Sequence, residues 1–269
     1  MKLDECRAVV TGAGGGIGRQ LVERMCRASA HVLLVGRRPE LLDEIAAIYP
    51  GHVERVCADL NEVAGRDAVL VAARDFGGIN CLINCAGTGG FGLLERQDDM
   101  AIDDVVTTNV TSVLQLTRRL LPLLREVESA VVLNVGSTLG SIGYPGYAAY
   151  CASKFALRGF SEALRRELAD TRVKVLYVAP RATRTAMNPQ AVEAMNRDLG
   201  VSMDSPGRVA AVVLMALLRE REETYLGWPE RLFVRINGLL PRCVDRALRK
   251  HLPVVRRFAG DPVTERKTA

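Results

Sequence analysis

The stretch TGAGGGIG, Thr11 to Gly18, decides how the rest of the chain is interpreted. It follows RAVVTG, an apolar run typical of a buried strand, and it opens GIGRQLVERMCRAS, whose apolar residues recur at helical spacing. Gly12, Gly16 and Gly18 allow a tight turn and let a pyrophosphate approach the helix N-terminus, where free N–H groups attract anions. The sequence therefore favours a dinucleotide site here over a glycine-rich turn without a ligand.

Beyond this turn, short β-branched runs alternate with longer helical patterns. Further strands are expected at HVLLVG, HVERVCA, INCLINCAG, SAVVLNVGS and RVKVLYVAP, with a seventh near TYLGW. Helices are expected at PELLDEIAAIY and over residues 61–76, 103–126 and 147–170. Apolar runs without alternation fit parallel strands covered on both faces, and helical connections imply right-handed crossovers. We predict an α/β fold: a doubly wound, mostly parallel Rossmann-type sheet of about seven strands, which binds ligands at the carboxyl ends of its strands.

Length and composition indicate a globular protein with one large domain. The 269 residues suit an α/β domain over 1–227 and an extension over 228–269, and 48% hydrophobic and 25% charged content is ordinary. No apolar run reaches the roughly 18 residues of a membrane span, and MKLDECRAVVTG lacks the pattern of a signal peptide. Seven scattered cysteines and three histidines predict no metal site and a reducing compartment. We therefore expect a cytoplasmic protein, either free or peripheral at the inner face of a membrane.

The end of the second predicted strand, VGRRPE, bears on the choice of cofactor. An acid at this place suits the ribose of NAD, whereas arginine suits the 2′-phosphate of NADP. Here Arg37 and Arg38 follow Gly36, so the sequence favours NADP(H) over NAD(H). The alternative is that one or both arginines are solvated surface charges.

The segment YCASK places Tyr150 and Lys154 on one face of a predicted helix. A phenol has a pKa of about 10, and a fixed ammonium nearby favours its ionised form. Such a pair can give a proton to a carbonyl oxygen or take one from an alcohol. Ser137 follows the fifth predicted strand, and Asn109 lies within the predicted long helix. Alone, the Tyr150–Lys154 spacing is also compatible with an ordinary surface pair.

Together these residues resemble the short-chain dehydrogenase/reductase family. The resemblance covers about residues 8–227 and includes TGAGGGIG, the NCAG that begins at Asn84, Asn109, Ser137 and YCASK, in order. Ser137 precedes Tyr150 by 13 residues, which is the spacing of the family. The resemblance implies hydride transfer between a nicotinamide cofactor and a carbonyl or secondary alcohol.

The resemblance also implies roles for particular residues. Tyr150 would be the acid/base, Lys154 would hold the nicotinamide ribose and lower the pKa of Tyr150, Ser137 would bind the substrate oxygen, and Asn109 would hold a water of the proton relay. Besides Tyr150, Lys154, Arg37 and Arg38, it implies that the following residues line the cofactor: Gly12, Gly16, Ile17, Gly18, Asp59, Leu60, Asn84, Ala86, Gly87, Pro180 and Thr185.

Two positions depart from the family pattern. NADP-dependent members often carry a basic residue where this chain has Gly15, so the preference for NADP rests on Arg37 and Arg38. After the sixth strand, PRATRT keeps Pro180 and Thr185 but has Arg181 in place of glycine. Arg181 and Arg184 either meet an acidic substrate or the cofactor diphosphate, or extend into water.

The segment between residues 186 and 205 corresponds to the family's mobile lid over the substrate. Its apolar residues are Met187, Met195, Leu199 and Met203. They suit an apolar carbonyl or alcohol substrate, or else they pack on the underside of the lid.

The extension carries most of the positive charge. Residues 228–258 contain eight Lys or Arg and two acids, a net charge of +6, whereas the whole chain has +5. If helical, the segment places Leu232, Phe233, Ile236, Leu239 and Leu240 within one arc, with Arg231, Arg235 and Arg242 on its flank, until Pro241 and Pro253 break it. Such a segment can lie on an anionic membrane, pack on a partner subunit or on the chain itself, or close over the substrate pocket. No nucleic-acid motif is evident.

The sequence thus predicts an NADP(H)-dependent oxidoreductase acting on a small apolar carbonyl compound or alcohol, as a homo-dimer or homo-tetramer. The alternative is a non-catalytic dinucleotide-binding sensor or scaffold, recruited to a membrane surface by its extension.

Overall fold

The computed structural model describes residues 1–260 and contains one seven-stranded sheet. All neighbouring strands are parallel, in the order β3-β2-β1-β4-β5-β6-β7. The strands are β1 (Arg7–Thr11), β2 (His31–Gly36), β3 (Val53–Cys57), β4 (Cys81–Asn84), β5 (Ala130–Val135), β6 (Val173–Ala179) and β7 (Glu223–Tyr225). The predicted doubly wound sheet is therefore confirmed, and each predicted strand is present.

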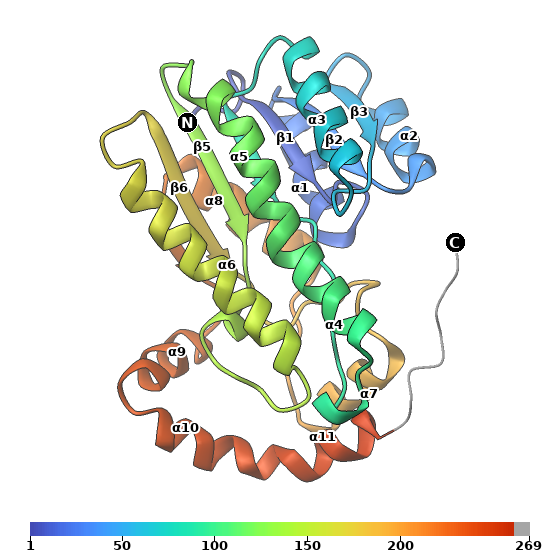
Figure 1. The fold of residues 1–269 in the computed structure, drawn as a ribbon, viewed down its shortest axis with the longest axis vertical. Helices are drawn as coiled ribbons and strands as arrows, with labels where there is room; N and C mark the ends of the chain where they lie inside the picture. Colours follow the sequence, from blue (N-terminus) through green and yellow to red (C-terminus); the bar gives the residue numbers. More distant parts are fainter. Residues whose placement is uncertain (261–269) are drawn as a thin grey trace.

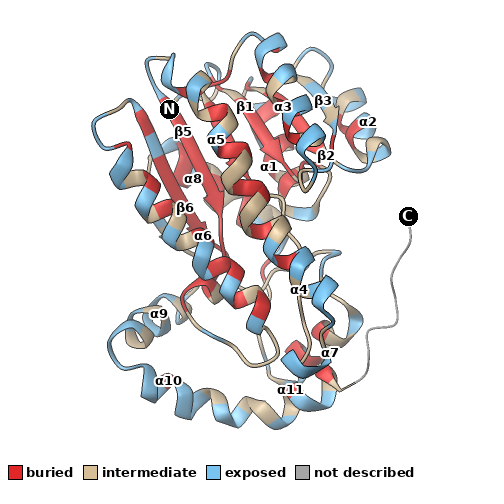
Figure 2. Cartoon of the chain, viewed as in Figure 1, coloured by how far each residue is buried: buried red, intermediate tan, exposed pale blue. Residues whose placement is uncertain are grey.

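Helices cover both faces of the sheet (Figure 1). One face packs against α1 (Gly16–Arg27), α2 (Pro39–Ile48) and α8 (Pro206–Leu218); the other packs against α3 (Val63–Asp75), α5 (Ser112–Arg125) and α6 (Ala148–Glu167). Neighbouring residues of one strand enter different cores: Val10 belongs to the first and Val9 to the second. Because both faces are covered, the inner strands are mainly apolar, and Figure 2 shows that they are buried.

The strand order reverses between β1 and β4, and this point is where such sheets bind ligands. The Thr11 hydroxyl at the end of β1 accepts the N–H groups of Cys85 and Ala86, each at 3.0 Å. These bonds hold the loop after β4 beside the glycine turn after β1. The carboxyl ends of the two central strands therefore form a single edge.

The helix expected over residues 103–126 has a different form in the structure. It begins earlier, as α4 (Asp99–Val106) with its N-terminus capped by Asp98, and a π-helical turn, Thr107–Thr111, separates it from α5. The turn contains Asn109, whose side chain bonds to groups outside the helix. Such π-turns are frequent at functional sites because the wider turn redirects a side chain.

The extension runs across the end of the molecule at which the carboxyl ends of the strands lie (Figure 1). It consists of α9 (Glu230–Leu239), α10 (Pro241–Leu248), a short 3₁₀ turn and α11 (Leu252–Ala259), which packs beside α7 (Gln190–Asp198). The predicted helix and the breaks at Pro241 and Pro253 are confirmed, since each proline lies in the first turn of a new helix. Over residues 1–260 no helix has both the length and the apolar character needed to cross a bilayer.

Candidate active site

The glycine turn forms a cradle without side chains at the N-terminus of α1. Gly12 has a φ of +66°, and a Cβ there would lie 2.9 Å from the Cα of Ala86. A Cβ on Gly18 would lie 2.1 Å from the Gly12 carbonyl oxygen, and one on Gly16 would lie 3.0 Å from the Thr185 side chain. No side chain caps this helix, so its first N–H groups are available to an anion. The cradle fits a dinucleotide phosphate, and Ile17 lies in its helical wall.

The predicted adenosine residues lie at the ends of the neighbouring strands. Arg37 and Arg38 follow β2 and are exposed, and the Arg37 guanidinium lies 3.8 Å from the Asp59 carboxylate. Leu60 comes next to Asp59, and its carbonyl accepts a hydrogen bond from Arg66. Arg66 is only 4% exposed, which sequence reasoning missed because nothing local marks a helix arginine as buried. It fixes the loop against which an adenine would lie.

Asn84 secures the sheet behind the site. Its buried amide donates to Asn134 at 2.8 Å and to Thr117 at 3.1 Å, and Asn134 in turn donates to Ser161 of α6. These bonds join β4, β5 and two helices. The Pro180 carbonyl, just after β6, accepts the Thr138 N–H at 2.8 Å and so ties the next strand to the same edge.

Ser137, Tyr150 and Lys154 meet at the end of β5. Ser137 follows the strand and is buried, while Tyr150 and Lys154 come from the first turns of α6. The Ser137 side chain lies close enough to the Tyr150 hydroxyl to favour its ionised form, and its Oγ atom accepts the Leu139 N–H at 3.1 Å. The Lys154 ammonium lies 5.8 Å from the centre of the Tyr150 ring and donates to the Val135 carbonyl at 3.4 Å. The structure thus brings together Ser137, Tyr150 and Lys154, three of the four predicted catalytic residues.

Burial controls the protonation of this group. Loss of hydration raises the pKa of Tyr150, and the nearby Ser137 hydroxyl only partly opposes this rise. Burial also lowers the pKa of Lys154 to about 8. In the protein alone the pKa of Tyr150 is therefore raised, and the expectation that Lys154 lowers it stays a prediction. At neutral pH the phenol keeps its proton.

Asn109, the fourth predicted catalytic residue, clamps the loop after β4. Its side-chain oxygen accepts the Thr88 N–H at 2.8 Å, and its amide donates to the Thr88 carbonyl at 3.0 Å and to Ser153 of α6 at 3.1 Å. A Cβ on Gly87 would lie 3.0 Å from this oxygen and 3.6 Å from the Lys154 nitrogen. Glycine at position 87 therefore allows Asn109 and Lys154 to approach the same backbone.

Aromatic and apolar side chains surround Tyr150. The rings of Tyr150 and Tyr147 lie 6.0 Å apart, and Phe91 lies 5.1 Å from Tyr147. A Cβ on Gly146 would lie 2.9 Å from Val255 of the extension and 3.0 Å from Phe91. The surroundings of Tyr150 and Tyr147 are therefore mostly aromatic and apolar, and Val255 of α11 contributes to them.

The extension and the lid both reach this side of the site. The Tyr144 hydroxyl hydrogen-bonds the Nδ1 atom of His251 at 2.9 Å. Met187 of the lid is half exposed and lies against Gly89, whereas Met195 is 1% exposed and packs beneath the lid. Met195 thus fits packing on the underside of the lid, whereas contact of Met187 with an apolar substrate stays a prediction. Sequence reasoning did not place His251, since nothing in its neighbourhood signals a contact 107 residues away.

The comparisons with known proteins decide the family. A family model described as short chain dehydrogenase matches residues 7–196. The chain belongs to the short-chain dehydrogenase/reductase family. It is 32% identical to an NADP-dependent 3-hydroxy acid dehydrogenase of Schizosaccharomyces pombe over 81% of this chain and 89% of that protein.

Two solved structures share the fold of this chain. A short-chain dehydrogenase from Burkholderia cenocepacia in complex with NADP has a TM-score of 0.80 at 27% identity, covering 92% of this chain and 99% of that one. A short-chain dehydrogenase/reductase from Burkholderia phymatum in complex with NAD has the same TM-score at 23% identity, covering 88% and 94%, and shows the fold alone. The chain is therefore a dinucleotide-dependent oxidoreductase of this family.

Arg181, which departs from the family pattern, is an internal ion-pair partner. Its guanidinium binds both oxygens of Asp204, at 2.9 and 3.0 Å, and Glu230 at 3.1 Å. Asp204 closes the lid by a backbone bridge to Thr183, and Glu230 begins α9. Arg181 therefore holds the lid and the extension together. Both predicted roles, contact with an acidic ligand and extension into water, are wrong for this residue. For Arg184, the structure gives a backbone N–H bonded to the Asp204 carbonyl.

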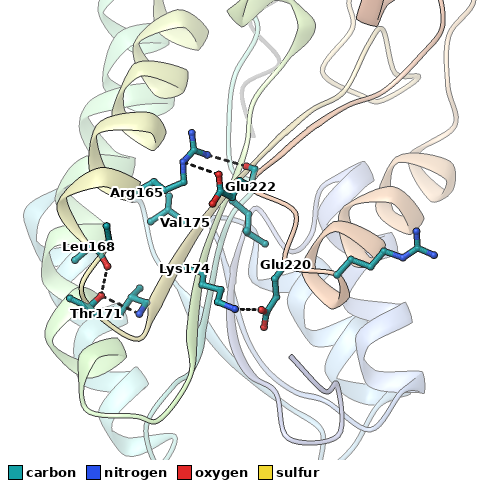
Figure 3. A pocket seen from close by; sticks show the side chains of 11 residues that line it. Arg165, Leu168, Thr171, Lys174, Val175, Glu220 and Glu222 are labelled. Atoms are coloured by element: carbon teal, nitrogen blue, oxygen red, sulfur yellow. Dashed lines mark hydrogen bonds and ion pairs between the residues drawn. The ribbon is translucent and has the colours of Figure 1, made fainter.

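A separate depression of about 510 Å³ lies at the other end of β6 (Figure 3). Four of its charged residues form ion pairs: Lys174 pairs with Glu220, and Arg165 lies 3.6 Å from Glu222. It begins where β6 begins, whereas Ser137 and Tyr150 lie at the opposite edge of the sheet. It is therefore distinct from the catalytic site. Within residues 1–260 no group of three or more His, Cys, Asp or Glu is placed to hold a metal ion.

We predict that Arg181→Met destabilises the fold by about 3 kcal/mol, because the nearly buried Asp204 carboxylate loses its main partner. Arg181 lowers the pKa of Asp204, so the pair stabilises the fold above the usual carboxyl pKa of 3.8 and this contribution is lost as the pH falls below it. The difference between the two proteins in urea unfolding should accordingly shrink on acidification.

Arg165→Met is the matched control, because it removes an arginine that is paired with the more exposed Glu222 and Glu223. It should cost no more than about 1 kcal/mol. Equal losses in the two variants, or a pH-independent loss for Arg181→Met, would contradict the account of this ion pair.

Proposed function

We propose that the protein is an NADP(H)-dependent oxidoreductase that transfers a hydride between the nicotinamide and a carbonyl or secondary alcohol. One observation carries this proposal: the buried Ser137 and Lys154 lie beside the half-buried Tyr150, at the same sheet edge as the glycine cradle. A phenol, a hydroxyl and an ammonium in this arrangement can move a proton at an oxygen of the substrate. The bound cofactor would supply or accept the hydride.

The side chains have distinct roles in this proposal. Tyr150 keeps its proton at neutral pH and donates it to the carbonyl oxygen, which the Ser137 hydroxyl holds by a hydrogen bond. Lys154 binds the nicotinamide ribose and supplies positive charge as the proton leaves the phenol. Asn109 positions the Thr88 backbone and Ser153 around Lys154, and in this proposal it also holds a water that replenishes the proton.

The cofactor would lie along the edge from the glycine cradle to the ends of β2 and β3. Its diphosphate fits at Gly12, Gly16, Ile17 and Gly18, and its adenosine beside Asp59 and Leu60. Two exposed guanidiniums, Arg37 and Arg38, support NADP(H), as does the name of the fission-yeast relative. One solved neighbour holds NADP and another NAD, so Arg37 and Arg38 carry the preference in this proposal.

The apolar surroundings of Tyr150 support an apolar carbonyl compound or alcohol as the substrate. Phe91, Tyr147, Met187 and Val255 provide this surface, and a carbonyl at Tyr150 is its polar end. Because the NADP pool is usually kept reduced, reduction is the proposed direction in the cell. A homo-dimer or homo-tetramer in the cytoplasm stays a prediction.

A dinucleotide-binding sensor or scaffold is the alternative function. Such a protein needs the glycine cradle, but it has no use for a protonated phenol beside a buried ammonium. Burying Lys154 disfavours its charge, as its lowered pKa shows, and a sensor would gain nothing from that arrangement. These considerations favour the enzyme.

Tyr150→Phe removes only the reacting hydroxyl, and we predict that it lowers the rate of NADPH-dependent carbonyl reduction by at least roughly 100-fold. Cofactor binding, measured by quenching of protein fluorescence, should be unchanged. Tyr49→Phe removes a phenol at the C-terminus of α2 and should have no effect on the rate. Near-full activity of Tyr150→Phe would make the proposed proton donor wrong.

Replacing both Arg37 and Arg38 by alanine should weaken NADPH binding about tenfold or more while NADH binding changes little, because charged hydrogen bonds to the 2′-phosphate are lost. Arg27→Ala with Arg74→Ala removes two exposed arginines from the last turns of α1 and α3 and serves as the control. Titration of each protein with both cofactors measures the effect. Equal losses for NADPH and NADH would refute the 2′-phosphate assignment.

A further inference from the structure

The apolar face of the extension is not covered by the part of the chain that the structure describes. The exposed fractions on α9 and its ends are 74% for Trp228, 43% for Leu232, 42% for Phe233, 81% for Leu239 and 59% for Leu240. These residues recur at the spacing of one helix face. Large apolar side chains gathered in this way on one short helix indicate a contact surface.

The opposite side of the extension is the one that rests on the body. Asn237 of α9 donates to the Ser141 carbonyl at 2.9 Å, and Val244 of α10 is only 4% exposed. At the far end, Val255 is fully buried beside Gly146, in the loop before α6. The extension is thus fixed in place by its inner residues, while most of α9 and α10 stays exposed (Figure 2). The exposed apolar residues on its outer face are therefore held in a fixed position.

Positive charge accompanies this apolar arc. Arg231, Arg235 and Arg242 are exposed and form no ion pair with any residue between 1 and 260. Arg246, Arg249 and Lys250 continue the same pattern along α10 and the turn after it. Residues 228–258 carry a net charge of +6, although the 227 residues before them sum to −1. The surface is therefore both apolar and cationic.

We propose that the outer face of α9 and α10, residues 228–250, binds the surface of an anionic lipid bilayer. Apolar side chains would enter the boundary between headgroups and acyl chains, and the arginines would contact lipid phosphates and carboxylates. A second copy of the chain is disfavoured as the occupant, because a two-fold contact would bring two equally cationic faces together. The substrate side of the site lies at the same end of the molecule, so this contact would present the site to molecules dissolved in the membrane.

Vesicle binding by the full-length protein tests this proposal. The probes are vesicles of phosphatidylcholine alone and of phosphatidylcholine with phosphatidylserine, and binding is measured by sedimentation. Trp228 is the single tryptophan of the chain, so its emission reports directly on the proposed surface. We expect sedimentation and a blue shift of the emission only with the anionic vesicles, and release of the protein when the salt concentration is raised.

Two pairs of substitutions separate the apolar and the cationic contributions. Leu239→Asp with Leu240→Asp, and separately Arg235→Gln with Arg242→Gln, should each weaken binding at least about tenfold. The matched controls should leave binding unchanged: Val63→Asp with Val71→Asp on α3, both more than half exposed, and Arg125→Gln with Arg172→Gln, both exposed. Reduction of a water-soluble carbonyl compound, together with thermal unfolding, checks that every variant is folded.

Three outcomes would overturn the proposal. The protein does not sediment with anionic vesicles, or the control pairs weaken binding as much as the α9–α10 pairs do. In the third outcome, Leu239→Asp with Leu240→Asp reduces the mass of an oligomer in light scattering while the unchanged protein binds no vesicles. That result would make the face a subunit interface. None of these outcomes depends on the cofactor or on the carbonyl chemistry proposed for the site.

Discussion

The buried ammonium group of Lys154 is the constraint on which the candidate active site depends. Burial disfavours its charged form and lowers its pKa to about 8. The surrounding groups must therefore stabilise the ammonium and keep it close to Tyr150. The Val135 carbonyl accepts one of its hydrogen bonds, and glycine at position 87 leaves the space beside it. The loop after β4, the end of β5 and the start of α6 are therefore fitted around one side chain. Asn109 holds the loop after β4 against α6 through its bonds to Thr88 and Ser153.

The same edge of the sheet also organises the parts that recognise ligands. Thr11 joins the ends of β1 and β4, and the Pro180 carbonyl joins β6 to the loop that carries Ser137. Arg181 then connects this end of the sheet to the lid through Asp204 and to the extension through Glu230. Reactive groups thus lie on strand ends and helix starts, while the segments that would select a substrate are attached by ion pairs and by the Tyr144–His251 hydrogen bond.

The sequence predicted the features that local patterns control. Apolar periodicity located the strands, and the spacing of Ser137, Tyr150 and Lys154 predicted their meeting, because one strand and the following helix carry all three. Three features depend on distant contacts and could not be predicted. Asn109 lies in a π-turn because it bonds to Thr88 and Ser153, and Arg181 is an internal partner because Asp204 and Glu230 lie 23 and 49 residues away. The raised pKa of Tyr150 follows from its depth of burial, which residue spacing does not give.

The pH dependence of carbonyl reduction and of alcohol oxidation, measured with the same enzyme and the same substrate pair, tests the central claim most directly. If the phenol of Tyr150 is the proton donor in one direction and the acceptor in the other, reduction should slow as the pH rises while oxidation accelerates, with a common apparent pKa. Burial raises the pKa of the phenol, so the change should come on the alkaline side of neutrality. If reduction and oxidation instead respond to pH in the same way, Tyr150 is not the group that carries the proton.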